Sequence, residues 1–318
     1  MGYSSTGTIA ASDYNTLAWG GTQGTYTASP NNIAYVLGVG NGAFGYGQSV
    51  TGINTISAAG IVTATQWSSL LTALNVCVQH QSGAAAAITV SPTFTTGAVA
   101  TYSSALNNAV TSINTNKSLF SAQGTTTTGA TFSPVISAAS TVAYSAVFAT
   151  RTVTFASGDA ARYFFNAGGQ LNLVIISSTN NATARSVDAS TVLVTNLGGL
   201  TAFRVLSNGG RTGTGGTLNT NATTIGYQGL TTSAANIVQV TSTTASYTTD
   251  YAQIRMLSSA QNVSGNGDKG AVISFQLFLN SPGHLATDVL SVTLNHRVDI
   301  VYPETTYLVS QWGTPVVA

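Results

Sequence analysis

The chain has 318 residues, of which only 5% are Asp, Glu, Lys or Arg, and its formal net charge is +1. A typical soluble protein carries roughly 25% of these residues, so Thr, Ser, Asn, Gln and Gly must form the polar surface here. The nine basic residues form no cluster, which excludes an electrostatic nucleic-acid binder. Copies of so neutral a chain repel each other weakly, so we expect the working state to be an assembly. The alternative is a soluble, hydroxyl-rich monomer.

The sequence predicts no cross-link, leader or membrane anchor. Cys77 is the single cysteine, so no intrachain disulfide can form, and stability must come from burial or assembly. Residues 1–7 have neither a basic start nor an apolar run, so no secretory signal is expected. No apolar run approaches the roughly 18 residues of a membrane-spanning helix. We therefore predict no membrane insertion.

Helical signals mark residues 1–120, which we expect to form a small helical domain. The pair Ser12-Asp13 predicts the start of a first short helix. The pair Ser29-Pro30 predicts the start of a second, because proline is favoured at the first helical position, and Gly38 predicts its end. Helices this short must pack against longer neighbours to be stable.

The clearest predicted helix begins at Thr63. Thr63 and Gln66 fit a capping box, in which each side chain bonds the other residue's free backbone amide. Apolar residues then recur at spacings of three and four, and Gly83 suits a left-handed end. The apolar stripe consists of Trp67, Leu70, Leu71, Leu74, Cys77 and Val78. A further helix is expected over residues 103–119, with its apolar face formed by Leu106, Ala109, Val110 and Ile113.

Between the predicted helices lies a glycine-rich loop, residues 38–48, with Phe44 and Tyr46 as its anchors. Such loops can hold phosphate, but this one lacks the Lys-Ser/Thr of a nucleotide-binding loop. We therefore assign it no phosphate. Residues 121–130 show no periodicity and contain four consecutive threonines, which predicts a linker.

Residues 131–318 predict an antiparallel β-sandwich of the jelly-roll type. Apolar residues alternate with polar ones in about eight to ten short runs separated by Gly, Asn and Ser. The longest run covers residues 290–302, and Val192 and Val194 predict another strand. The glycine-rich residues 208–216 predict a flexible surface loop carrying Arg211, which either wraps a neighbour or has no partner.

The stretch 159–176 predicts a β-hairpin. In the first arm, Tyr163 and Phe165 alternate with Arg162 and Phe164. In the second arm, the alternating residues are Leu171, Leu173 and Ile175 on one side and Asn172 and Val174 on the other. Residues 166–169, Asn-Ala-Gly-Gly, tolerate the positive φ of a tight turn. The C-terminal stretch 303–314 contains Tyr307 and Trp312, and it either docks on a neighbouring subunit or completes its own sheet, which we favour.

Candidate chemistry in the sequence is sparse. Cys77 and His80 suit one side of a helix, but zinc needs further ligands, so Cys77 is expected in the core and His80 at a cap or on the surface. His296 is expected to be a hydrogen-bonded structural residue. Asp250 and Asp288 could meet as a glycosidase pair, although so few carboxylates make this unfavoured. We predict no catalytic residue, no metal and no cofactor.

Two sets of motifs resemble structural proteins of tailed bacteriophage particles. One is Arg162-Tyr163-Phe164-Phe165-Asn166-x-Gly168-Gly169-Gln170. The other is an ordered series: Asp13-Tyr14-Asn15, Leu37-Gly38-Val39-Gly40, Gly45-Tyr46-Gly47-Gln48, Ile61-Val62-Thr63-Ala64 with Trp67 and Leu70, and His80-Gln81-x-Gly83. Together they cover the front half of the chain.

The resemblance implies a non-enzymatic virion component of neck, tail or fibre type, assembled in the bacterial cytoplasm into a symmetric oligomer. Its partners would be copies of itself and other virion proteins. The alternative is a tail-fibre module that binds a host glycan or protein, and a depolymerising enzyme is a third reading without a β-helix repeat to support it. The candidate interface and loop residues are Phe44, Tyr46, Trp67, Arg211, Tyr307 and Trp312.

Overall fold

The computed structural model describes residues 11–20, 23, 32–83, 98–283 and 285–318. The chain forms two compact units. Unit 1 comprises residues 1–124, 166–168 and 303–311, and unit 2 comprises residues 125–165, 169–302 and 312–318. Two short segments from the second half of the sequence thus belong to the helical unit, which the domain limits 1–120 and 131–318 did not anticipate.

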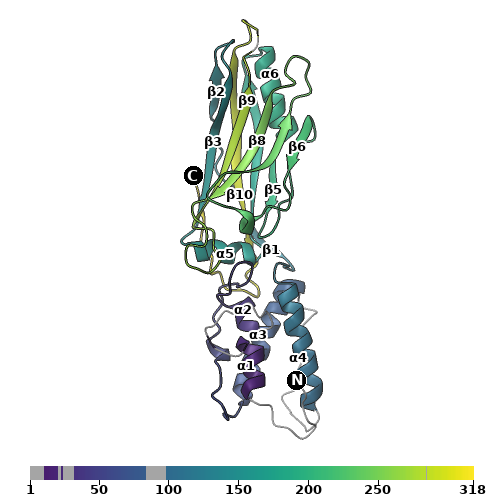
Figure 1. The fold of residues 1–318 in the computed structure, drawn as a ribbon, viewed down its shortest axis with the longest axis vertical. Coiled ribbons are helices and arrows are strands. Elements are labelled where there is room, and N and C mark those ends of the chain that lie inside the picture. Colours follow the sequence, from purple (N-terminus) through teal and green to yellow (C-terminus); the bar gives the residue numbers. More distant parts are fainter. Residues whose placement is uncertain (1–10, 21–22, 24–31, 84–97, 284) are drawn as a thin grey trace. The chain divides into compact units, whose positions relative to one another are not determined.

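Unit 1 is helical (Figure 1). Its elements are α1 (Ala11–Trp19), α2 (Ile33–Leu37), the 3-10 helix η1 (Thr51–Ile53), α3 (Ala64–Ser82) and α4 (Ala98–Thr115). The capping box at the start of α3 is confirmed, because the Thr63 hydroxyl accepts from the Gln66 amide and the Gln66 side chain accepts from the Thr63 amide. Gly83 follows α3 with a φ of 92°, in the positive range that favours glycine.

The short helix α2 begins with a different cap from the predicted one. The Asn32 side chain accepts a hydrogen bond from the Tyr35 amide at 2.8 Å, whereas Ser29-Pro30 lies outside the described residues. Every residue of α2 is buried, and the side chains of Leu70, Leu74, Leu106 and Val110 from α3 and α4 are buried in the same unit. The helical domain predicted from apolar spacing is therefore confirmed, with α4 starting and ending earlier than the spacing suggested.

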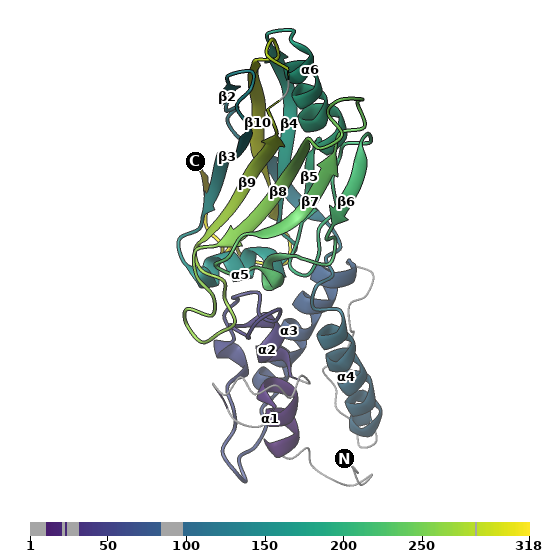
Figure 2. The same ribbon diagram turned by 45° about the horizontal axis from the view of Figure 1, so that its top comes forward.

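Unit 2 is a β-sandwich of two antiparallel sheets (Figures 1 and 2). The five-stranded sheet has the order β1-β10-β4-β5, with β2 also paired to β10, and the six-stranded sheet has the order β11-β3-β9-β8-β7-β6. The strands are β1 (Gln123–Thr127), β2 (Val135–Ala138), β3 (Tyr144–Thr154), β4 (Gln170–Asn180), β5 (Gly199–Phe203), β6 (Thr217–Asn221), β7 (Ala235–Thr241), β8 (Tyr251–Ser258), β9 (Val272–Ser281), β10 (Leu290–Pro303) and β11 (Val316–Val317). Alternate residues of β10 are buried from Leu290 to Val298, as its pattern predicts, but Asp299, expected on the other face, is also buried.

The predicted linker at residues 121–130 does contain the boundary between the two units, at residues 124 and 125, but it is not irregular throughout because it contains strand β1. All five residues of β1 are exposed, so its side chains give no alternating pattern to detect. Its strand conformation depends on pairing with β10, and the local sequence gives no indication of this pairing. The prediction that residues 303–314 complete their own sheet is wrong, because residues 303–311 belong to unit 1 and the strand that pairs with β3 is β11, beyond the predicted stretch.

The predicted hairpin is half wrong, because its first arm is a helix, α5 (Gly158–Asn166). Four residues spaced as one helical face, Ala160, Ala161, Phe164 and Phe165, are buried together. The Ser157 hydroxyl accepts from the Ala160 amide at 3.0 Å, and Asp159 pairs with Arg162 one turn later at 2.9 Å. The glycine turn is where it was predicted, with Gly168 at a φ of 93°, but it connects a helix to β4.

Two further predictions in unit 2 are corrected. Residues 192 and 194 belong to a helical stretch in which α6 (Ala184–Thr191) continues into the π-helical segment η3 (Val192–Leu197). The glycine-rich residues 208–216 run along the edge of β5, where Thr201 donates to Gly210 and Thr212 donates to Gly199 through their backbones. This stretch protects one edge of the five-stranded sheet from pairing with other chains.

Phe164 and Phe165 provide a direct test of α5. Both are fully buried, and Phe165 stacks on Tyr227 with ring centroids 4.5 Å apart. We expect Phe164→Ala and Phe165→Ala each to lower the free energy of unfolding by about 3–5 kcal/mol, measured by denaturant titration. Tyr163→Ala, at the half-exposed neighbouring position, should cost clearly less. A large loss at only one of the two phenylalanines would support the alternation of a strand instead.

Candidate functional site

The glycine-rich loop of unit 1 folds back on the end of α2. The Tyr46 amide donates to the Val36 carbonyl at 2.9 Å, and the Gly47 amide donates to the Gly38 carbonyl at 2.8 Å. Gly45 has a φ of 96°, and a Cβ there would lie 2.1 Å from the Val39 carbonyl oxygen. Only glycine permits so close an approach of two backbone segments.

Asn166 fastens this loop from a distant part of the sequence. Its side-chain amide donates to three loop carbonyls, those of Gly42 at 3.0 Å, Phe44 at 2.9 Å and Gly45 at 3.1 Å. Asn166 is only 1% exposed, so these bonds are shielded from water. The two motifs that carried the phage resemblance, the glycine loop and the Asn-x-Gly-Gly turn, therefore meet in one place.

Tyr46 connects the same loop to the two long helices. Its hydroxyl donates to the Lys117 carbonyl at 3.0 Å and accepts from the Gln81 side chain at 2.8 Å. Gln81 also donates to the Ile113 carbonyl near the end of α4. Burial raises the pKa of Tyr46, which keeps the phenol neutral and available as a donor.

A buried pair of titratable side chains holds the returning segment 303–311. The Nδ1 atom of His80 lies 2.8 Å from Oε1 of Glu304, and both residues are buried. The other Glu304 oxygen accepts from the backbone amides of Thr306 and Tyr307. Burial raises the pKa of the Glu304 carboxyl, but the bonds from His80 and Tyr307 outweigh it and leave that pKa below its ordinary value. The prediction that His80 lies at a cap or on the surface is thus wrong.

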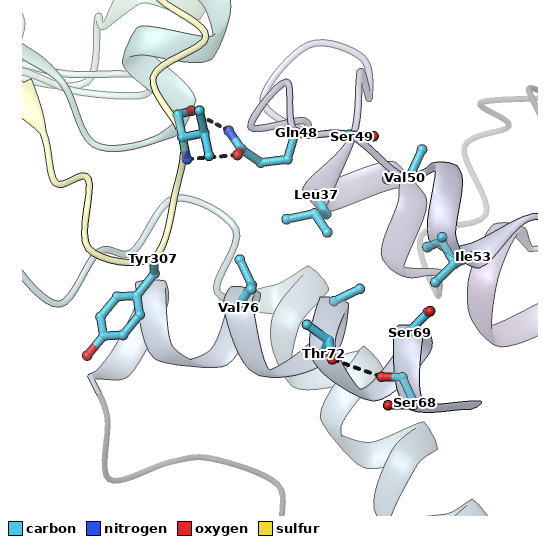
Figure 3. A pocket seen from close by; sticks show the side chains of 13 residues that line it. Leu37, Gln48, Ser49, Val50, Ile53, Ser68, Ser69, Thr72, Val76 and Tyr307 are labelled. Atoms are coloured by element: carbon cyan, nitrogen blue, oxygen red, sulfur yellow. Dashed lines mark hydrogen bonds between the residues drawn. The ribbon is translucent and has the colours of Figure 1, made fainter. Parts of the chain in front are cut away.

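A pocket of about 430 Å³ opens beside this segment (Figure 3). The Gln48 side chain forms one boundary, because its amide group makes two hydrogen bonds to the backbone of Val309, at 2.8 and 2.9 Å. Helix α3 forms the floor. The pocket is lined by Leu37, Gln48, Ser49, Val50, Gly52, Ile53, Ser68, Ser69, Thr72, Ala73, Val76, Tyr307 and Val309.

The chemistry available in the pocket is that of a binding surface. The side chains around it are aliphatic groups, hydroxyls and one amide, and none of these lining residues is Asp, Glu, Lys, Arg, His or Cys. General acid or base catalysis commonly uses His, Asp, Glu, Lys or Cys side chains, and the lining contains none of these. The pocket therefore suits an uncharged, largely apolar group.

Of the six candidate interface or loop residues, three are buried and three are partly exposed. Tyr46, Trp67 and Trp312 are buried in the folded chain, so they do not form an exposed interface, whereas the prediction that Tyr46 anchors the glycine-rich loop is confirmed. Arg211 binds the carbonyls of Asn196 and Gly215 within its own chain. Phe44 is partly covered by Tyr35 and by the Lys117 ammonium, which lies 4.6 Å from its ring centre. Tyr307 is half-exposed and lines the pocket.

The remaining titratable candidates serve the fold. Cys77 is buried, as expected. His296 accepts from Arg151 at 2.9 Å, and burial together with the arginine charge lowers the pKa of His296 to about 4, which confirms a hydrogen-bonded structural histidine. Asp250 and Asp288 do approach a common neighbour, Arg185, but both carboxylates are buried.

Sequence reasoning missed Asn166 and Glu304 as organising residues. Glu304 is the single glutamate of the chain, which was the available signal.

Within the described residues, no group of three His, Cys, Asp or Glu side chains could hold a metal ion, and no helix is long and apolar enough to cross a membrane. Comparisons with protein-family models, curated proteins and solved structures gave no match. The resemblance to phage proteins accordingly stays a prediction.

The three hydrogen bonds donated by Asn166, here called the Asn166 clamp, predict the order of stability of two variants at this position. Asn166→Ala removes three donated bonds and should destabilise the chain by about 1–3 kcal/mol. Asn166→Asp should destabilise it more, because a carboxylate would then face three carbonyl oxygens. Urea titration and hydrogen exchange of the loop amides would measure both effects, with the exposed Asn54→Asp as the charge control. Equal stability of Asn166→Asp and wild type would contradict the clamp.

The Glu304 pair predicts a pH dependence with a defined sign. A carboxyl whose pKa is lowered by folding stabilises the fold above its ordinary value of 4.5, and the stabilisation is lost as the pH falls through the lower folded pKa. Glu304→Gln should therefore be less stable than wild type at pH 7, with the difference shrinking towards pH 3. Denaturant titrations across that range test this, with Asp13→Asn as the control. A difference independent of pH would refute it.

Proposed function

We propose that the protein is a non-enzymatic structural component of a tailed-phage virion, of neck, tail or fibre type, which assembles into a symmetric oligomer. The observation that carries the proposal is the near absence of charge from unit 1. Within residues 1–124, 166–168 and 303–311, the charged residues are Asp13, Lys117 and Glu304. Glu304 is buried, which leaves two charges at the surface of a unit of this size.

So neutral a surface favours contact with other proteins over isolation in water. Charge repulsion is the usual means by which a protein keeps copies of itself apart. A surface of hydroxyl, amide and backbone groups forms protein–protein hydrogen bonds without the desolvation penalty of ions. Unit 1 is therefore suited to being covered by neighbouring subunits.

The site also supports an architectural role. The buried polar side chains of unit 1, Tyr46, Gln81, Asn166 and Glu304, fix backbone segments of the chain itself. The pocket beside residues 303–311 is lined by no Asp, Glu, Lys, Arg, His or Cys. Two of the motifs that resemble phage proteins, the glycine loop and the Asn-x-Gly-Gly turn, meet in this framework, which favours a structural role for them over a catalytic one.

We expect assembly of the purified protein to resist salt. Contacts between uncharged groups are hardly screened, whereas ion pairs at a surface weaken with ionic strength. Light scattering should give an oligomer whose mass stays a fixed multiple of 32.3 kDa between low salt and 1 M NaCl. Dissociation at moderate salt would argue against the proposal. Imaging intact phage particles with a label on this chain would then test its place in a virion.

A further inference from the structure

One cation lies on the outer face of the six-stranded sheet. Alternate residues of β8 from Ala252 to Ser258 are at most 1% exposed and form part of the core, so Arg255 between them faces outward. Figure 2 shows β7, β8 and β9 lying side by side in this sheet. Its strands contain one other charged residue, Arg151, which points inward and donates to His296 of the opposite sheet. Arg255 is therefore the single charge that these strands place on the outer face.

Neighbouring side chains hold Arg255 in one position. Its Nε atom donates to the side-chain oxygen of Gln253 at 2.6 Å, and its guanidinium carbon lies 4.0 Å from the centre of the Phe278 ring. Gln253 is held in turn by a bond to Gln239 at 2.5 Å, and Tyr251 stacks on Phe278 with ring centroids 5.9 Å apart. A guanidinium fixed in this way loses little conformational freedom when it binds a ligand.

The terminal nitrogens of Arg255 are available for such a ligand. The Nε donor is used by Gln253, and Nη1 and Nη2 carry the remaining N–H donors. Within the described part of the chain, these two atoms have no hydrogen-bond partner, and no carboxylate pairs with the guanidinium. Arg255 is also half-buried, so water solvates its charge only in part. A half-buried cation without a counter-ion favours the binding of an anion.

A second copy of the chain offers hardly any carboxylate to this face. Asp159 is paired with Arg162 of its own helix, and Asp13 lies half-buried on α1. The other six of the eight carboxylates are buried: Asp188, Asp250, Asp268, Asp288, Asp299 and Glu304. The anion that pairs with Arg255 therefore belongs to a different kind of molecule.

The strand register places uncharged polar side chains on both sides of Arg255. Arg255 pairs with Asn236 of β7 and with Gln276 of β9, and Gln276 pairs in turn with Thr150 of β3. Paired residues point to the same face with Cβ atoms about 4.5–5.5 Å apart, so the four side chains form a row across four strands. Thr150 is exposed, and the half-buried Gln276 has no side-chain hydrogen bond to the described residues. Amide and hydroxyl groups both donate and accept, as the hydroxyls of a sugar do.

We propose that the row Asn236–Arg255–Gln276–Thr150 binds a glycan that carries carboxylate groups. The planar fork of a guanidinium matches a carboxylate in shape and in charge, through two parallel N–H···O bonds. The flanking amides and the Thr150 hydroxyl match the sugar hydroxyls beside that carboxylate. The aromatic rings of Phe278 and Tyr251 keep the fork in place while the sugar binds.

Other anions fit this row less well. Extended peptides bind to sheet edges or to grooves, where their backbone groups find partners, whereas the row lies on the open face of a sheet. A phosphate monoester carries a charge of about −1.5 to −2 at pH 7, which one guanidinium does not neutralise. The proposal concerns unit 2 alone and does not rest on the proposed place in a virion.

The test presents the full-length protein with oligosaccharides of galacturonate, glucuronate and sialic acid, each beside its own methyl ester. The ester keeps the sugar and its hydroxyls but removes the charge. In at least one pair, we expect the acid to bind about tenfold or more tightly than the ester, measured by titration calorimetry. Arg255→Gln should remove this preference, and Arg255→Lys should keep only part of it, because an ammonium lacks the planar fork.

Two further variants separate charge from hydroxyl recognition. Gln276→Leu should weaken the acid and its ester alike, because it removes an amide and leaves the guanidinium. Lys269→Gln removes a positive charge from the β8–β9 loop, outside the row, and should bind like wild type.

Three results would overturn the proposal. They are equal binding of acid and ester in every pair, no binding of any acid at millimolar concentration, and an acid preference that survives Arg255→Gln. The first two need only the wild-type protein, so the test does not depend on how a variant folds. Binding of an oligoglutamate peptide but of no acidic glycan would also overturn it, in favour of a protein partner. None of these results bears on the salt-resistant oligomer of the proposed function.

Discussion

An almost uncharged chain must satisfy its buried polar groups with other neutral groups, and this constraint shapes both units. In unit 1, the amide of Asn166 bonds three carbonyls of the glycine loop, and the amide of Gln48 bonds the backbone of Val309. Side-chain amides can donate and accept at once, so they replace the backbone partners that irregular loops lack. The buried charged side chains of Glu304 and Arg185 are each tied to several partners.

The same constraint governs the sheet edges of unit 2. Natural proteins often protect edge strands with lysine or proline, but few lysines are present in this chain. The edge of β5 is covered instead by the glycine-rich residues 208–213, which pair with it through backbone bonds. Glycine suits this role because Gly213 passes so close to Asn196 that a Cβ would lie 2.2 Å from its carbonyl oxygen. A loop that looks featureless in the sequence thus closes a sheet.

Much of the fold followed from periodicity, and the errors have identifiable causes. Helix α3 and strand β10 were predictable because each carries a mainly apolar stripe at the right spacing and α3 also has a capping box. Helix α5 was misread because Tyr163 to Phe165 are aromatic, and aromatic residues also favour strands. Its cap at Ser157 was the local signal that favoured the helix. Strand β1 carried no signal, since all its side chains are exposed.

The amino-acid order by itself determined the helical first part, the sandwich that follows and the scarcity of charge, because these depend on neighbours along the chain and on composition. Tertiary structure decided which distant residues meet. Asn166 reaches a loop more than 120 residues earlier, and His80 meets Glu304 across 224 residues. Such contacts depend on the path of the whole chain, since a single asparagine or glutamate carries no local mark of the partner it will bind.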